Sequence, residues 1–206
     1  MKLTRQLFRG TLIFLASATL MILAGAVSAA PLTQQKRIRE VQRNVRLSSA
    51  KMDAAAYIFR YYNRNLSEEK AKEYARFVME ASHRYSIDPA LITGIIIKES
   101  TAKATARSKY AVGLMQVYWQ LHKKTIGSLF PHIQSEKVLM EPRNNIMVGT
   151  WLFSQYMINC KGDVTKALRR YLGSQATHYV ALVNKYRGQF SERVSYNLQR
   201  AVKRHV

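Results

Sequence analysis

The sequence of 206 residues contains a single cysteine, Cys160. One cysteine cannot form an internal disulfide bond, so the fold has to be stabilised by its apolar core. The hydrophobic fraction of 48% is sufficient for such a core. We expect Cys160 to be a buried thiol, and a disulfide bond between two chains is the alternative.

Several motifs of cofactor and metal chemistry are missing. The chain has no glycine-rich phosphate loop, no HExxH motif, and no cysteines and histidines at the spacing of metal ligands. Its histidines are scattered, and no Ser-His-Asp or Cys-His set can be assembled from them: His83, His122, His132, His178 and His205. The sequence therefore predicts no metal site and no organic cofactor.

Acidic residues are scarce. The chain has 12 of them against 33 lysines and arginines, a formal net charge of +21, and no Asp or Glu between Ser100 and Ser135. Such a charge attracts anionic partners and speeds their encounter. Nucleic acid, cell-wall polymer and anionic lipid all fit, and so does a charge that only maintains solubility.

The first residues narrow this choice. Lys2, Arg5 and Arg9 precede an uncharged apolar run from Thr11 to Ala26, and the segment AVSAAP follows. This pattern predicts a signal peptide over residues 1–29. The alternative is an uncleaved anchor, although the run is slightly shorter than the roughly 20 residues that span a bilayer. Either interpretation places the domain in the periplasm or cell envelope, where nucleic acid is not an expected partner.

The rest of the chain has the hydrophobic spacing of helices. We expect an all-α domain over residues 45–190. A polar, basic linker or frayed helix should precede it at 30–44, and a basic tail should follow it at 191–206.

Several helices of this domain have clear start signals. Ser67, Asp88 and Asp163 are predicted N-caps, and a long helix is expected to start near Pro142. A short helix is expected around residues 114–121. Near the end of the domain, a helical stripe is formed by Tyr179, Leu182, Val183 and Tyr186.

The helix that follows Asp88 is apolar around almost its whole circumference, which predicts a buried central helix. Glu99 lies at its end. A desolvated carboxyl has a raised pKa and can act as a proton donor near neutral pH. The alternative is that Glu99 faces water at the helix end and pairs with a lysine. This segment alone favours neither interpretation.

The segment after Glu99 has residues that suit a sugar ligand: Tyr110, Gln116, Tyr118 and Trp119. A glycosidase usually places two carboxylates around the scissile bond, and this segment offers no second one. If Glu99 is catalytic, we expect it to act alone.

In order and spacing, these residues resemble the motifs of the lytic transglycosylase catalytic domain of the soluble lytic transglycosylase (SLT) type, within the lysozyme-like superfamily. The first motif is Glu99-Ser100 and the second is Gly113-Leu114-Met115-Gln116. The third is Asn145-Ile146 followed by Gly149, and the fourth is matched only at Tyr171. The resemblance covers about residues 70–187 and implies a lysozyme-like all-α fold.

The resemblance also implies a reaction. Enzymes of this family cut the β-1,4 bond between N-acetylmuramic acid and N-acetylglucosamine in peptidoglycan, without a cofactor. Glu99 would first protonate the leaving oxygen and then, as a base, deprotonate the 6-hydroxyl of the sugar. The product would be a 1,6-anhydromuramic acid end.

Further site residues are expected around Glu99. Those expected to contact substrate are Ser100, Ser108, Gly113, Met115, Gln116, Tyr118 and Tyr171. Tyr171 would orient Glu99 or the N-acetyl group. Asn145 is expected mainly to brace a loop near the site, and Trp151 to belong to the core. For Tyr118 and Trp119, stacking on sugar and packing in the core remain alternatives.

One position departs from the family pattern, because Leu172 stands where the family has asparagine. This departure favours one alternative to a transglycosylase, a catalytically weakened wall-binding or scaffold protein. A hydrolytic muramidase is a further alternative, which does not depend on Leu172. We expect a monomer whose partner is the peptidoglycan glycan strand. A secretion or assembly machine of the cell envelope is a further partner that domains of this type suggest.

Overall fold

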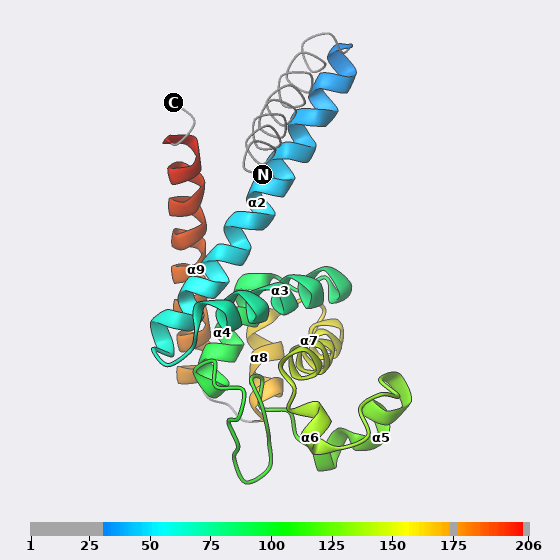
Figure 1. Ribbon diagram of the computed structural model, residues 1–206. Helices are drawn as coiled ribbons and strands as arrows, with labels where there is room; N and C mark the ends of the chain where they lie inside the picture. Colours follow the sequence, from blue (N-terminus) through cyan, green and yellow to red (C-terminus); the bar gives the residue numbers. More distant parts are fainter. Residues whose placement is uncertain (1–30, 174–176, 204–206) are drawn as a thin grey trace, which may run out of the picture. The chain divides into compact units, whose positions relative to one another are not determined.

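The computed structural model describes residues 31–173 and 177–203. The signal peptide predicted at 1–29 lies outside them. The regular elements of the described residues are all helices, with two isolated β-bridges and no strand, so the predicted all-α fold is confirmed. The helices, shown in Figure 1, are α2 (Leu32–Tyr62), α3 (Glu68–Tyr85), α4 (Pro89–Ser100), α5 (Trp119–Leu129), α6 (Glu136–Leu139), α7 (Pro142–Asn159), α8 (Val164–Leu172) and α9 (Thr177–Lys203).

The chain divides into two units, residues 1–46 and 47–206. The described part of the first unit, residues 31–46, is almost entirely helical. The segment expected to be a linker or a frayed helix is therefore a helix as far as it is described. In the second unit, α9 continues through the expected tail as far as Lys203 without a break at residue 190.

The predicted helix starts are confirmed, and the caps show why. The side chain of Ser67 accepts a hydrogen bond from the Lys70 amide (3.2 Å), and that of Asp163 accepts one from the Lys166 amide (2.9 Å). Asp88 caps α4 in the same way, by accepting from the Ala90 amide at 3.0 Å. Each cap satisfies an amide that has no partner within its helix.

The prediction of a short helix around residues 114–121 is wrong, because α5 begins only at Trp119. Val112 and Val117 exchange two backbone hydrogen bonds, of 3.1 and 3.0 Å. These bonds hold the four residues between them in a tight turn, with positive φ angles at Gly113 (+80°) and Gln116 (+47°). A helix cannot start until the chain leaves this turn.

The central helix of the second unit is α4, whose residues are buried from Pro89 to Ile97. It packs on α9 and α3, while α7 packs on α3 and α8. Gly94 allows the close approach to α9, because a Cβ atom at this position would lie 3.0 Å from the Val183 carbonyl oxygen. Cys160 is a free, buried thiol, as expected.

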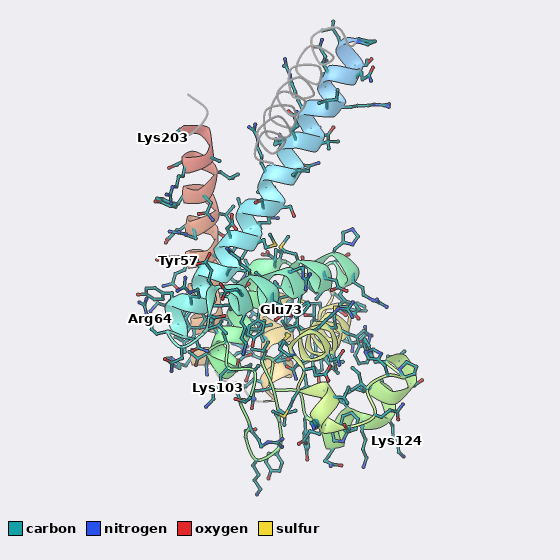
Figure 2. All side chains as sticks on the ribbon, viewed as in Figure 1. Tyr57, Arg64, Glu73, Lys103, Lys124 and Lys203 are labelled. Carbon is teal, nitrogen blue, oxygen red and sulfur yellow. The ribbon has the colours of Figure 1, made fainter. Side chains whose placement is uncertain are left out.

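Positive charge is spread over the second unit. Figure 2 shows the labelled residues Arg64, Lys103, Lys124 and Lys203 on four separate parts of the chain. Within the described ranges, no helix is both long and apolar enough to cross a membrane.

Candidate active site

The C-terminal end of α4 is fixed to the turn that follows Val112. The single hydroxyl hydrogen of Ser100 is shared between the carbonyls of Leu114 and Ile96, whose oxygens lie 2.8 and 3.0 Å from its Oγ. Thr101 then ends the helix in the left-handed conformation, with φ = 53°. The side chain of Glu99 is therefore presented from a rigid helix end rather than from a loose loop.

The carboxyl group of Glu99 is largely buried and accepts one strong hydrogen bond. Tyr179 of α9 donates its hydroxyl to Glu99 Oε1 at 2.6 Å. Burial raises the pKa of Glu99, while the bond from Tyr179 and the charge of Lys98 partly oppose this shift. No ion pair of Glu99 is present among the described residues. The geometry therefore matches the desolvated acid rather than a solvated carboxylate paired with a lysine.

Two tyrosines stand close to this acid, and they have different roles. Burial raises the pKa of both Tyr171 and Tyr179 well above the ordinary value, and the charge of Glu99 raises it further. Both hydroxyls therefore keep their protons and act as donors. Tyr171 donates to the Met115 carbonyl at 2.8 Å. Of the two roles expected for Tyr171, the contact with Glu99 is made by Tyr179 instead.

The turn at residues 113–116 is braced by Asn145, whose side chain is fully buried. Its Oδ1 accepts from the Met115 amide at 2.8 Å, and its Nδ2 donates to the carbonyls of Val112 (2.9 Å) and Leu139 (3.2 Å). At Gly113 a Cβ atom would lie 2.2 Å from this Nδ2. The geometry supports the bracing role expected for Asn145.

The amide side chain of Gln116 also belongs to this turn, although one face of it reaches the cleft. It donates to the carbonyls of Ala106 (3.2 Å) and Gly113 (3.0 Å). Met115 is buried behind the turn against Gly149, where a Cβ atom would lie 2.6 Å from Met115 Cβ. Gly113 therefore leaves space for the side chain of Asn145, and Gly149 leaves space for that of Met115.

A cleft of about 650 Å³ opens in front of Glu99. The turn segment, α5, α7 and α8 form its walls. Its lining residues are Lys98, Glu99, Ser108, Tyr110, Ala111, Gln116, Val117, Tyr118, Leu121, His122, Leu152, Tyr156, Arg170, Tyr171, Leu172 and Gly173. Pockets of this size, with a few convergent polar groups, are typical ligand sites.

Of the residues expected to contact substrate, the structure brings four to the cleft with Glu99: Ser108, Gln116, Tyr118 and Tyr171. The other three, Ser100, Gly113 and Met115, are buried and do not line it. Their contacts show how they shape the turn and the helix end behind the wall.

The aromatic residues divide in a similar way. Tyr118 lies in the cleft wall with its ring centroid 5.5 Å from that of Tyr110. Trp119 packs against the core, and Trp151 forms an edge contact with Phe130 at 6.2 Å. The geometry therefore favours Tyr118 over Trp119 as a stacking surface, and it matches the core position expected for Trp151.

Sequence reasoning missed several members of the site. Tyr179 was assigned only to a helical stripe, and it meets Glu99 across 80 positions of the chain. Lys98, His122, Tyr156 and Arg170 line the cleft without belonging to a motif. For Arg170 the sequence does offer a signal, because the basic pair at 169–170 directly precedes the motif residue Tyr171.

The electrostatics of the cleft are unusual for a glycosidase. Glu99 is the one carboxylate among the described lining residues, and Lys98 and Arg170 contribute positive charge. Burial lowers the pKa of His122, so this side chain is neutral near pH 7. Within the described residues no three metal-ligating side chains gather around a common point.

The all-α fold of the described residues is consistent with a lysozyme-like domain of the SLT type. A model of the transglycosylase SLT domain matches residues 76–193, more than half of the chain. The protein therefore belongs to the SLT transglycosylase family, as the motifs had indicated. No solved structure matches the chain at a significant level.

Proposed function

We propose that the protein is a peptidoglycan lytic transglycosylase that cleaves the β-1,4 bond between N-acetylmuramic acid and N-acetylglucosamine. The observation that carries this proposal is the cleft with one carboxylate, whose pKa is raised by burial. A protonated acid of this kind can donate to a leaving oxygen.

The first step uses the proton of Glu99. As the carboxyl gives its proton to the glycosidic oxygen, the bond from the muramic acid C1 to that oxygen breaks and positive charge develops at C1. In a retaining glycosidase a second carboxylate stabilises this centre. Here no second carboxylate lines the described cleft. The carbonyl oxygen of the substrate's own N-acetyl group takes that role.

The second step uses the same residue as a base. Glu99, now ionised, removes the proton of the muramic acid 6-hydroxyl, and this oxygen bonds to C1. The proton returns to Glu99 and no water is consumed. The hydrogen bond from Tyr179 stabilises the ionised form between the two steps.

The cleft lining suits an anionic amino sugar. Tyr118 and Tyr171 provide flat faces, Ser108 and Gln116 provide polar groups, and Arg170 adds positive charge. The proposed substrate is a glycan strand in the periplasm or cell envelope, reached after export. We propose a monomer for which a secretion or assembly machine is an additional partner.

The expected product separates the proposal from a hydrolytic muramidase. Digestion of purified cell walls should give muropeptides that end in 1,6-anhydromuramic acid, each lighter by one water than the hydrolytic product. Mass spectrometry of the soluble fragments measures this difference. If the fragments carry reducing ends instead, Glu99 activates water and the protein is a muramidase.

A catalytically weakened wall-binding protein is the second candidate, and Leu172 is the observation in its favour. This side chain lines the cleft where the family has a polar amide. Cell-wall binding without release of any fragment would identify this function.

The hydroxyl of Tyr179 gives a prediction with a definite sign. In Tyr179→Phe the carboxylate loses a donor that lowers the pKa of Glu99, so this pKa rises. Because the acid must be protonated, the alkaline limb of the pH–activity profile should move to higher pH. Activity at the optimum should fall about tenfold, the equivalent of one hydrogen bond.

Release of dyed cell-wall fragments between pH 4 and 9 measures this effect. Tyr186→Phe is the matched control, because it removes a hydroxyl from the same helix away from Glu99. An alkaline limb that stays in place in Tyr179→Phe would show that Tyr179 does not act on the proton of Glu99.

A further inference from the structure

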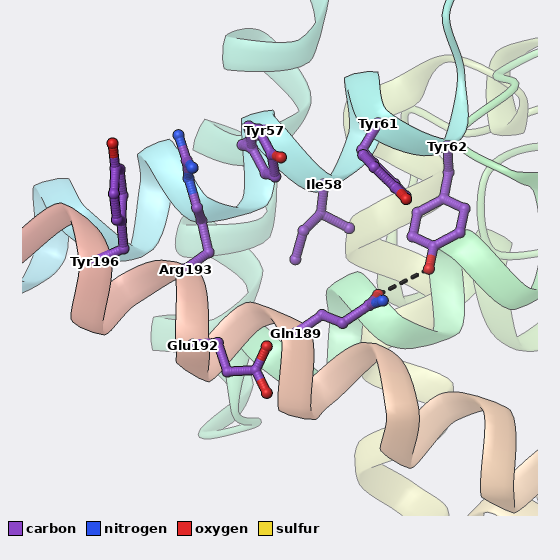
Figure 3. Close-up of a pocket in the computed structure, with 8 residues that line it drawn as sticks. All are labelled: Tyr57, Ile58, Tyr61, Tyr62, Gln189, Glu192, Arg193 and Tyr196. Atoms are coloured by element: carbon purple, nitrogen blue, oxygen red, sulfur yellow. Dashed lines mark hydrogen bonds between the residues drawn. The ribbon is translucent and has the colours of Figure 1, made fainter.

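A second pocket lies between the C-terminal part of α2 and α9, with a volume of about 310 Å³ (Figure 3). It shares no lining residue with the catalytic cleft. The helix α2 contributes Tyr57, Ile58, Tyr61 and Tyr62, and α9 contributes Gln189, Glu192, Arg193 and Tyr196. None of these residues belongs to the motifs of the catalytic site.

The guanidinium group of Arg193 is held between two aromatic rings. It lies 3.7 Å from the ring centroid of Tyr57 and 4.6 Å from that of Tyr196. Figure 3 shows the three side chains beside the pocket. Stacking of this kind fixes the plane of the group and covers its faces. Stacking does not cover the N–H edge of the guanidinium group, and this edge is the part that binds carboxylates in a bidentate manner.

Arg193 has no acidic partner within the described residues, and its Nε is buried without a hydrogen bond. Buried donors are normally satisfied in folded proteins. The Nε atoms of Arg169 and Arg187 lack a partner as well, so this feature alone does not mark a ligand site. The stacked guanidinium group without a counter-charge, in the wall of a pocket, is what points to a ligand.

The pocket has a second unpaired charge of opposite sign. Glu192 is exposed and has neither a hydrogen bond nor an ion pair among the described residues. Gln189 accepts a hydrogen bond from the Tyr62 hydroxyl at 2.8 Å, which fixes its amide and leaves its N–H₂ group to donate. A ligand that matches this set has a carboxylate for Arg193 and a cationic or N–H group for Glu192.

These charges select among anionic ligands. A phosphate-rich polymer or a lipid headgroup would be repelled by Glu192. A peptide end with both a carboxylate and an ammonium group satisfies both residues. Tyr57, Tyr61 and Tyr196, which are 44%, 48% and 48% exposed, provide apolar faces for its aliphatic parts.

We propose that this pocket binds the free stem peptides of peptidoglycan, with Arg193 on a carboxylate and Glu192 on the ammonium group of a terminal diamino acid. That the peptide comes from peptidoglycan rests on the proposed function. That it has a carboxylate and an ammonium group follows from the residues of the pocket. The enzyme would then hold uncross-linked peptides with α2 and α9 while the cleft acts on glycan. Cell walls rich in free stems would bind more tightly than highly cross-linked ones.

The test uses the full chain and a soluble stem tripeptide that ends in a diamino acid, with isothermal titration calorimetry as the readout. Wild type should bind this peptide, and amidation of its carboxylates should weaken binding about tenfold or more. Arg193→Gln and Arg193→Lys should show the same loss, because lysine lacks the planar fork. Arg200→Gln on the same helix is the control for loss of one charge.

Glu192→Gln tests the other half of the site. It should weaken the peptide with a free ammonium group and leave the N-acetylated peptide unchanged. Circular dichroism of each variant shows that the helices are intact. Equal losses in Arg193→Gln and Arg200→Gln, or equal binding of the free and amidated peptides, would overturn the proposal.

Failure of this inference and failure of the proposed function are distinguishable. The peptide has no glycosidic bond, so its binding does not depend on Glu99 and should be unchanged in Glu99→Gln. Conversely, Arg193→Gln should cleave glycan strands stripped of peptides at the wild-type rate. A variant that loses peptide binding but still cleaves glycan is impaired only in the pocket. A variant that binds peptide but no longer cleaves glycan is impaired only in the cleft.

Discussion

Glu99→Gln is expected to release cell-wall fragments about a thousandfold more slowly than wild type, because the same carboxyl donates the first proton and accepts the second. A single general acid or base contributes roughly 10²–10⁴ to a rate, and no other carboxylate lines the described cleft to replace it. The amide of glutamine has nearly the same shape and can still accept the hydrogen bond of Tyr179. The effect is therefore confined to proton transfer.

Loss of turbidity of purified sacculi measures this change, and mass analysis of the fragments identifies the residual product. Glu73→Gln is the matched control, because Glu73 is an exposed carboxylate on α3. The assignment of Glu99 is wrong if the Glu99→Gln variant clears sacculi as fast as the control.

Glu99→Gln should also change the free energy of unfolding. The expected change is a gain in stability, which a misfolded variant would not show. Burial raises the pKa of Glu99 in the folded state. The folded protein thus loses stability as the pH rises above the value of an unfolded glutamate, about 4.3. Glutamine removes this penalty. At pH 8 the free energy of unfolding of Glu99→Gln should exceed that of wild type by roughly 0.5–2 kcal/mol, and the difference should vanish at pH 4.

Asn145→Ala should be the most destabilising of the substitutions considered. It removes the acceptor of the Met115 amide and the donor to the carbonyls of Val112 and Leu139, all of them buried. Each buried polar group left without a partner costs about 1–3 kcal/mol. We expect a loss of about 3–5 kcal/mol in the free energy of unfolding, and a midpoint temperature lower by about 6–15 °C.

Thermal unfolding by circular dichroism measures the loss, with Asn65→Ala as the control, since Asn65 is an exposed asparagine in the turn after α2. Activity should fall together with stability, because the turn that Asn145 braces also holds Gln116 in the cleft wall. A midpoint within about 2 °C of the control would show that other contacts hold the turn.

The helix starts of this protein could be predicted because their causes are local. Ser67, Asp88 and Asp163 accept hydrogen bonds from amides two or three residues ahead. The short helix was placed wrongly for the opposite reason. Its start is delayed by the bonds between Val112 and Val117, and the turn they close depends on Asn145, about 30 residues away.

The candidate site was predicted in part. The motif residues Glu99, Gln116 and Tyr171 do reach the cleft. Ser100 and Met115 follow the same motifs and are buried, because a motif marks what a segment needs in order to fold as well as what touches a ligand. Spacing along the chain does not separate these two uses.

By itself, the sequence determined that the chain forms helices, that one of them is buried all round, and that a carboxyl group stands at its end. These features depend on residues a few positions apart. Only the tertiary structure decided the state of that carboxyl. Its desolvation and its bond to Tyr179 arise from the packing of α4 on α9, and a pKa responds to whatever lies within a few ångströms, however distant in the chain.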